Sequence, residues 1–137
     1  MTEPSQQQTP NSRRLGNVRS GVALVLGAVF MGVGIAKLAS MPFIVETFRA
    51  WGYPPWFRVA IGLTETLAGV LVLIPATRAL GAAIVAAVML GAIGTHVVAG
   101  QWTMVPVPMV TLVLALLLVS ALRPRFEPHP TVDRSPP

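Results

Sequence analysis

The chain has 137 residues, of which 53% are hydrophobic and only 11% are charged, and its formal net charge is +5. Soluble domains usually have roughly 25% charged residues, so this composition favours a protein whose solvent is lipid. Cysteine is absent, which excludes disulfides, thiolate nucleophiles and cysteine-ligated metal or iron–sulfur centres. The basic residues flank apolar runs and do not cluster among aromatics, which argues against a nucleic-acid partner.

The two ends of the chain differ from its middle. Residues 1–19 are rich in Gln, Ser, Thr and Pro, and residues 123–137 contain prolines at positions 124, 128, 130, 136 and 137. Neither segment has enough apolar residues to offset the entropy lost on ordering. Both are therefore predicted to be disordered tails, and both are expected in the cytosol on the charge argument given below.

Four apolar runs lie between the tails, and each is long enough to cross a hydrocarbon core of roughly 30 Å as a helix. They are predicted at residues 20–38, 57–74, 78–98 and 106–122. Helix-breaking residues separate the runs: Pro42, Gly52, Pro54, Pro55, Pro75, Gly100 and Pro106. The predicted fold class is all-α, an integral membrane antiparallel four-helix bundle over residues 20–122.

Basic residues are distributed unequally between the two sides of this bundle. One side has seven of them: Arg13, Arg14, Arg19, Arg78, Arg123, Arg125 and Arg134, whereas the other has Lys37, Arg49 and Arg58. The positive-inside rule predicts a cell-membrane protein with both termini in the cytoplasm. The rival interpretation is that the first run is a cleaved signal peptide. Cleavage after Ala39 would need a small residue at position 37, and the chain has Lys37 there.

The connection at residues 39–56 is the longest, and it is rich in aromatic residues. This density is typical of an interfacial belt. Residues 43–50 are predicted to form a short amphipathic helix on the outer face of the membrane. Small residues four apart, at Ala28, Gly32 and Ala36 and at Ala83, Ala87, Gly91 and Thr95, predict close helix packing within the bundle or a dimer interface.

Glu65 lies near the middle of the second run, where an unpaired ionised carboxylate would cost at least about 2.5–3.5 kcal/mol. It is predicted to face the bundle, where Gly62 and Gly69 on the same face let a helix or a ligand come close. Lys37 and His96 end the first and third runs at one level, and all three side chains lean toward one another.

These three groups predict a polar pocket in the outer half of the membrane, and Lys37, Glu65 and His96 are the candidate cofactor-binding residues. Phe30, Val33 and Met89 are expected to supply an apolar wall. The alternatives are that Lys37 extends to the headgroups, that His96 is an interfacial histidine, and that Glu65 only holds helices together. No catalytic triad, phosphate loop or metal-ligand set is present in the sequence, so catalysis by the chain alone is not expected.

At these residues the sequence resembles the DoxX-like family of four-span membrane proteins. The resemblance covers residues 27–124 and rests on four blocks: Gly34-Ile35-Ala36-Lys37-Leu38, Phe48 with Trp51-Gly52-Tyr53-Pro54, Ile61-Gly62-Leu63-Thr64-Glu65 through Pro75, and Met89-Leu90-Gly91-Ala92-Ile93-Gly94-Thr95-His96. It implies a quinone-associated or redox-associated membrane subunit, because named members are linked to quinol oxidase, thiosulfate:quinone oxidoreductase and oxidative-stress complexes.

Three functions remain open from the sequence: a redox-complex subunit with a quinone-binding pocket, a small proton-coupled transporter, and a non-catalytic scaffold or assembly factor. No intrinsic cofactor is expected, and quinone is the candidate ligand. The expected partner is the lipid bilayer, while a soluble or membrane oxidoreductase and a homo-oligomer stay open.

Overall fold

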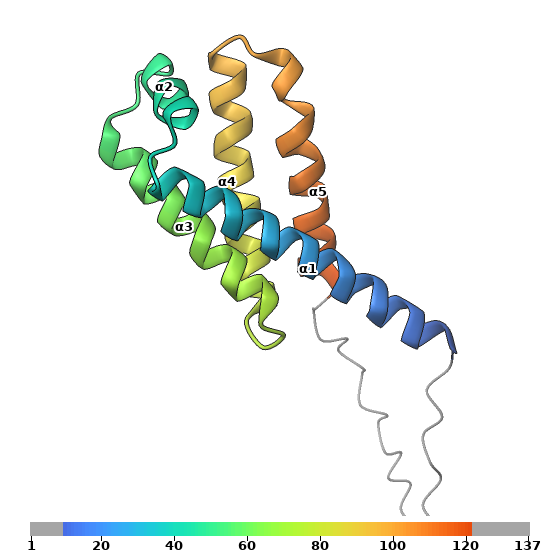
Figure 1. The fold of residues 1–137 in the computed structure, drawn as a ribbon. Helices are drawn as coiled ribbons and strands as arrows, with labels where there is room; N and C mark the ends of the chain where they lie inside the picture. The colour runs from blue at the N-terminus through green and yellow to red at the C-terminus, as the bar shows by residue number, and fades with distance from the viewer. Residues whose placement is uncertain (1–9, 122–137) are drawn as a thin grey trace, which may run out of the picture.

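The protein is described by a computed structural model that covers residues 10–121. Its elements are α1 (Pro10–Leu38), α2 (Pro42–Ala50), α3 (Pro55–Leu73), α4 (Arg78–Val98), the short 3-10 helix η1 (Trp102–Met104) and α5 (Pro106–Ala121) (Figure 1). Stretches long and apolar enough to cross a membrane lie in α1, in α3, in α4 and from Trp102 to Ser120, which takes in η1 and most of α5. The predicted fold class, an all-α membrane bundle with four spans, is confirmed.

Prolines set most of the helix starts, because a residue without an N–H is well tolerated in the first turn. Helices α2, α3 and α5 each begin at a proline, and α4 has the predicted bounds. Helix α1 begins at Pro10, ten residues before its predicted start at Ser20. Residues 10–19 are thus helical and not part of a disordered tail, since the sequence has no proline from 11 to 38 to end the helix. The predicted tails at 1–9 and 123–137 lie outside the described residues.

The helices pack in the order α1, α3, α4, α5. The contacts are extensive between α1 and α3, between α3 and α4 and between α4 and α5, whereas α1 meets α5 only slightly. In Figure 1, α1 crosses the other helices obliquely, and α2 lies at the end of the bundle where α1 finishes and α3 begins. We call this the α2 end.

The buried apolar core lies toward the opposite end of the bundle. It consists of side chains from all four long helices: Ala23, Leu26, Phe30, Ala68, Val72, Ala82, Val85, Ala86, Ala115 and Leu118. On α1 and α5 these residues come from the portions that lie away from α2, and on α3 and α4 they flank the turn that joins the two helices. The four helices are therefore held together at this end, which leaves the α2 end free to form a cavity.

Glycines make the contact between α1 and α3 unusually close. A Cβ atom placed on Gly69 would lie 2.6 Å from the Met31 backbone nitrogen and 2.7 Å from the Gly27 carbonyl oxygen. Gly62 faces α1 in the same way, with its Cβ position 3.0 Å from the Gly34 carbonyl oxygen. Small residues let helix backbones approach in this manner, so the predicted close approach at the Gly62 and Gly69 face is confirmed.

The small-residue rows predicted to pack within the bundle are not the ones that do so. Five of the seven residues in the two predicted rows are exposed, and the other two, Ala36 and Thr95, are half-buried. The contacting row on α1 contains Gly27 and Gly34 instead. Neighbouring residues on a helix differ by about 100° around the axis, so a row that starts one residue later faces away from the partner helix.

The membrane orientation stays a prediction, and single cysteines can test it because the chain contains none. Ala76 in the α3–α4 turn and Thr103 in the α4–α5 connection are exposed and lie at opposite ends of the bundle. In intact cells we expect an impermeant thiol reagent to label Thr103→Cys and not Ala76→Cys, with both labelled after permeabilisation. The reverse pattern would place both termini outside.

Candidate ligand-binding site

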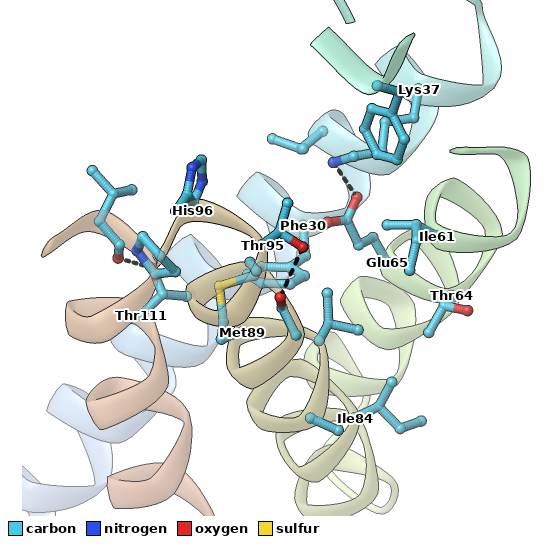
Figure 2. Close-up of a pocket in the computed structure, with 18 of the residues that line it drawn as sticks. Phe30, Lys37, Ile61, Thr64, Glu65, Ile84, Met89, Thr95, His96 and Thr111 are labelled. Atoms are coloured by element: carbon cyan, nitrogen blue, oxygen red, sulfur yellow. Dashed lines mark hydrogen bonds and ion pairs between the residues drawn. The ribbon is translucent and has the colours of Figure 1, made fainter. Parts of the chain in front are cut away.

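A cavity of about 660 Å³ lies at the α2 end, between the four long helices. Its size is within the roughly 300–1,000 Å³ of small-molecule sites, which are mostly apolar with a few polar groups. The three residues predicted to form an apolar wall, Phe30, Val33 and Met89, all line it. So do the three candidate binding residues Lys37, Glu65 and His96, which Figure 2 shows in the same close-up.

Lys37 and Glu65 form an ion pair inside the bundle. The Lys37 ammonium nitrogen lies 2.6 Å from Glu65 Oε2, and the two side chains are only 13% and 6% exposed. The pairing follows from the close approach of α1 to α3, since a Cβ on Gly62 would lie 3.0 Å from Lys37 Cβ. The predicted meeting of Lys37 with Glu65 is confirmed, and Lys37 does not extend to the headgroups.

Arg58 fixes the end of α1 from which Lys37 projects, a role that the sequence analysis missed. Its buried guanidinium donates hydrogen bonds to the Lys37 carbonyl oxygen and, at 2.9 Å, to Ser40 Oγ. A cation is favourable at a helix C-terminus because the last carbonyls lack partners within the helix. The signal was an arginine inside a predicted span, which is rare unless the residue has a specific partner.

The backbone at this helix end has the hydrogen bonds of a Schellman motif. The Ser40 amide donates to the Lys37 carbonyl at 3.2 Å and the Met41 amide donates to the Ala36 carbonyl at 3.4 Å. Ser40 has φ of +57°, a left-handed conformation that usually favours glycine. The hydrogen bond from Arg58 to Ser40 Oγ helps hold a serine in this position.

His96 lies across the cavity from the ion pair (Figure 2). Its Nδ1 is 2.9 Å from Gln101 Oε1, and its ring meets the edge of the Trp51 ring at a centroid distance of 5.4 Å. Either the ring donates Nδ1–H to Gln101 Oε1, or the Gln101 amide is turned so that its N–H donates to Nδ1, and in the second arrangement Nε2–H is left to donate to another partner. The structure therefore brings His96 to the same cavity as Lys37 and Glu65, but not into contact with them.

Aromatic side chains from the α2 region cover the cavity. This aromatic cluster consists of Phe48, Trp51, Tyr53 and Phe57, all of which line the cavity. Its closest ring pairs are 4.6 Å and 5.4 Å apart between centroids, a spacing typical of favourable aromatic contacts. The Tyr53 hydroxyl and Thr95 Oγ1 are 2.8 Å apart and hydrogen-bonded, which links the cluster to α4.

The predicted aromatic belt is therefore divided between two roles. Phe43 and Trp56 are 78% and 68% exposed, as expected for rings at a membrane interface. The aromatic cluster instead packs on itself above the cavity. The sequence analysis missed this second role, because aromatic side chains are common both at membrane interfaces and in the walls of ligand cavities.

Comparison with known proteins gives the family. The sequence matches the DoxX-like family over residues 21–118, a segment that includes Lys37, Glu65 and His96. It is 31% identical over 100 residues to the uncharacterized protein YdgD of Bacillus subtilis (strain 168), an alignment that covers 67% of this chain and 87% of that protein. No solved structure is significantly similar to the chain. The chain belongs to the DoxX-like family and is a multi-pass membrane protein.

Proposed function

We propose that the protein is a quinone-associated or redox-associated membrane subunit whose cavity binds a quinone headgroup for a partner oxidoreductase. The observation that supports this proposal is one mostly apolar cavity that has the Lys37–Glu65 ion pair on one wall and His96 on another. The positive-inside orientation would place the cavity in the outer half of the membrane.

The chemistry of a quinone fits these groups. Its flat ring is apolar, and its two carbonyl oxygens lie at opposite edges of the ring. Lys37 and His96 are hydrogen-bond donors on different sides of the cavity, so one ring can engage both of them. Reduction to the quinol takes two electrons, which the partner enzyme would supply, and two protons, for which Glu65, a carboxylate that lines the cavity, is the candidate relay.

Titration with a short-chain quinone tests this site, with quenching of tryptophan fluorescence as the readout because Trp51 lines the cavity. We expect Glu65→Gln, Lys37→Met and His96→Leu each to weaken binding about tenfold, equivalent to about 1.4 kcal/mol. Glu46→Gln is the matched control, since Glu46 is exposed on α2 and lies outside the cavity. Binding that all three variants leave unchanged would reject the site.

A proton-coupled transporter is the second candidate, because a carboxylate paired with a lysine inside a span can exchange protons with a substrate. The same variants separate the two functions in proteoliposomes. Substrate-driven proton release that Glu65→Gln abolishes would favour the transporter. Quinone binding without proton release would favour the redox-associated subunit, and neither activity would favour the scaffold.

A further inference from the structure

We propose that the cavity opens sideways into the bilayer between α1 and α5, and that its ligand is a membrane-dissolved amphiphile whose apolar chain lies in this opening. The inference rests on the proposed function for the polar headgroup. It adds the route of entry and the requirement for a long apolar chain. We call the opening, bounded by Val29, Val33 and Val107, the α1–α5 seam.

Helix packing identifies this side as the open one. Each pair of neighbours along the order α1, α3, α4, α5 packs extensively, whereas α1 and α5 meet only slightly. Helices α1 and α5 both contribute to the buried core, but their core residues lie away from the α2 end. These residues are Ala23 and Leu26 on α1, and Ala115 and Leu118 on α5. At the level of the cavity, α1 and α5 are thus not joined by the buried core.

The exposure of the residues that line the cavity also indicates that it opens between α1 and α5. Val29, Val33 and Val107 line the cavity, yet they are 53%, 42% and 69% exposed. A side chain that borders a cavity and is also exposed lies at its mouth. By contrast, Glu65 and Phe48 on the α3 and α2 walls are buried. The mouth therefore has a rim of valines from α1 and α5.

The side of the cavity between α3 and α4 differs from the α1–α5 seam because a hydrogen bond crosses it. Ala87 and Gly91 of α4 are exposed lining residues there, but the Tyr53–Thr95 hydrogen bond ties the α2–α3 connection to α4 across it. Among the described side chains of α1 and α5, no hydrogen bond joins the two helices. A ligand can pass between α1 and α5 without breaking a polar contact.

The chemistry of the seam and the cavity together defines the ligand. The Lys37 and Glu65 side chains are 13% and 6% exposed, against 42% for Val33 one turn earlier on α1, so the polar groups are deeper in the protein than the apolar rim. Lipid-facing valines suit a hydrocarbon chain, whereas the ion pair and His96 suit a polar head. A water-soluble ligand would gain nothing from the rim, so the arrangement selects a head with an attached apolar chain.

Tryptophan substitutions in the seam test the proposal. Val33→Trp and Val107→Trp narrow the mouth, while Ile35→Trp and Val110→Trp are matched controls on the same helices, exposed but outside the cavity. In nanodiscs, we expect the seam variants to weaken binding of a long-chain quinone at least about tenfold more than binding of its short-chain analogue. The controls should show equal effects for both chain lengths. If the seam variants lost the same affinity for both analogues, the proposed opening between α1 and α5 would be rejected.

A second measurement does not depend on the quinone. A phospholipid with a photoactivatable acyl chain should label cavity residues such as Met89 in the wild type, and less so in Val33→Trp and Val107→Trp. Absence of cavity labelling in the wild type would reject a lateral opening. Labelling without any quinone binding would instead retain the seam and reject the proposed function.

Discussion

Replacing Glu65 by leucine while Lys37 remains is expected to destabilise the folded protein by about 3–5 kcal/mol. The reason is that the Lys37 amine, only 13% exposed and held 2.6 Å from the carboxylate, would lose its partner in an apolar setting. The free energy of unfolding can be measured by titrating dodecyl sulfate into mixed micelles. Glu65→Gln should lose less, because an amide still accepts a hydrogen bond from Lys37.

A double-mutant cycle isolates the pair from the loss of either side chain. Lys37→Met combined with Glu65→Leu should recover part of the stability, because neither charge is then left alone. Strict additivity of the two single losses would contradict the interaction. Glu46→Leu is a useful comparison, since Glu46 is exposed on α2 and its replacement should change stability little.

Alanine at Gly69 is expected to destabilise the bundle by about 1–3 kcal/mol, the usual range for overpacking. Its Cβ would lie 2.6 Å from the Met31 nitrogen and 2.7 Å from the Gly27 oxygen, and backbone atoms in a helix cannot yield locally. Helices α1 and α3 would have to separate, which would also pull Lys37 from Glu65. The same unfolding titration gives the loss, and quinone affinity should fall with it.

Gly32→Ala is the control for this substitution. Gly32 also lies within α1, but a Cβ placed there meets nothing within 4 Å. Alanine is a better helix former than glycine by about 0.8–1.0 kcal/mol, so this variant should be neutral or slightly more stable. A loss of stability in Gly32→Ala and none in Gly69→Ala would contradict the described packing of α1 on α3.

The four spans were predictable because apolar length and proline position depend on local sequence alone. The bounds of α4 match the prediction, α3 differs from it by two residues at its start and one at its end, and α5 begins at the predicted Pro106. The start of α1 was not predictable in this way, since residues 10–19 are polar and their helix is a continuation of the span. The packing rows were not predictable either, because two faces of α1 have small residues, Gly27 and Gly34 on one and Ala28, Gly32 and Ala36 on the other.

The part of the candidate site that could be predicted is the need of the Glu65 carboxylate for a partner inside the bundle. A carboxylate in the middle of a span requires a partner, and Lys37 was a candidate partner, but only the structure decides between the ion pair and extension of Lys37 to the headgroups. The contributions of Arg58 and the aromatic cluster depend on how the α2 region folds back over the bundle. That fold is set by tertiary contacts among residues distant in the chain, such as Tyr53 with Thr95.

Quinone titration of the wild type against the double variant Glu65→Gln with His96→Leu tests the central proposal most directly. Glu65 holds Lys37 on one wall of the cavity and His96 lies on another, so under the proposal the double variant weakens the interaction at both edges of the headgroup. We predict saturable binding to the wild type and a loss in the double variant greater than in either single variant, with folding retained. Wild-type affinity in the double variant would contradict the account.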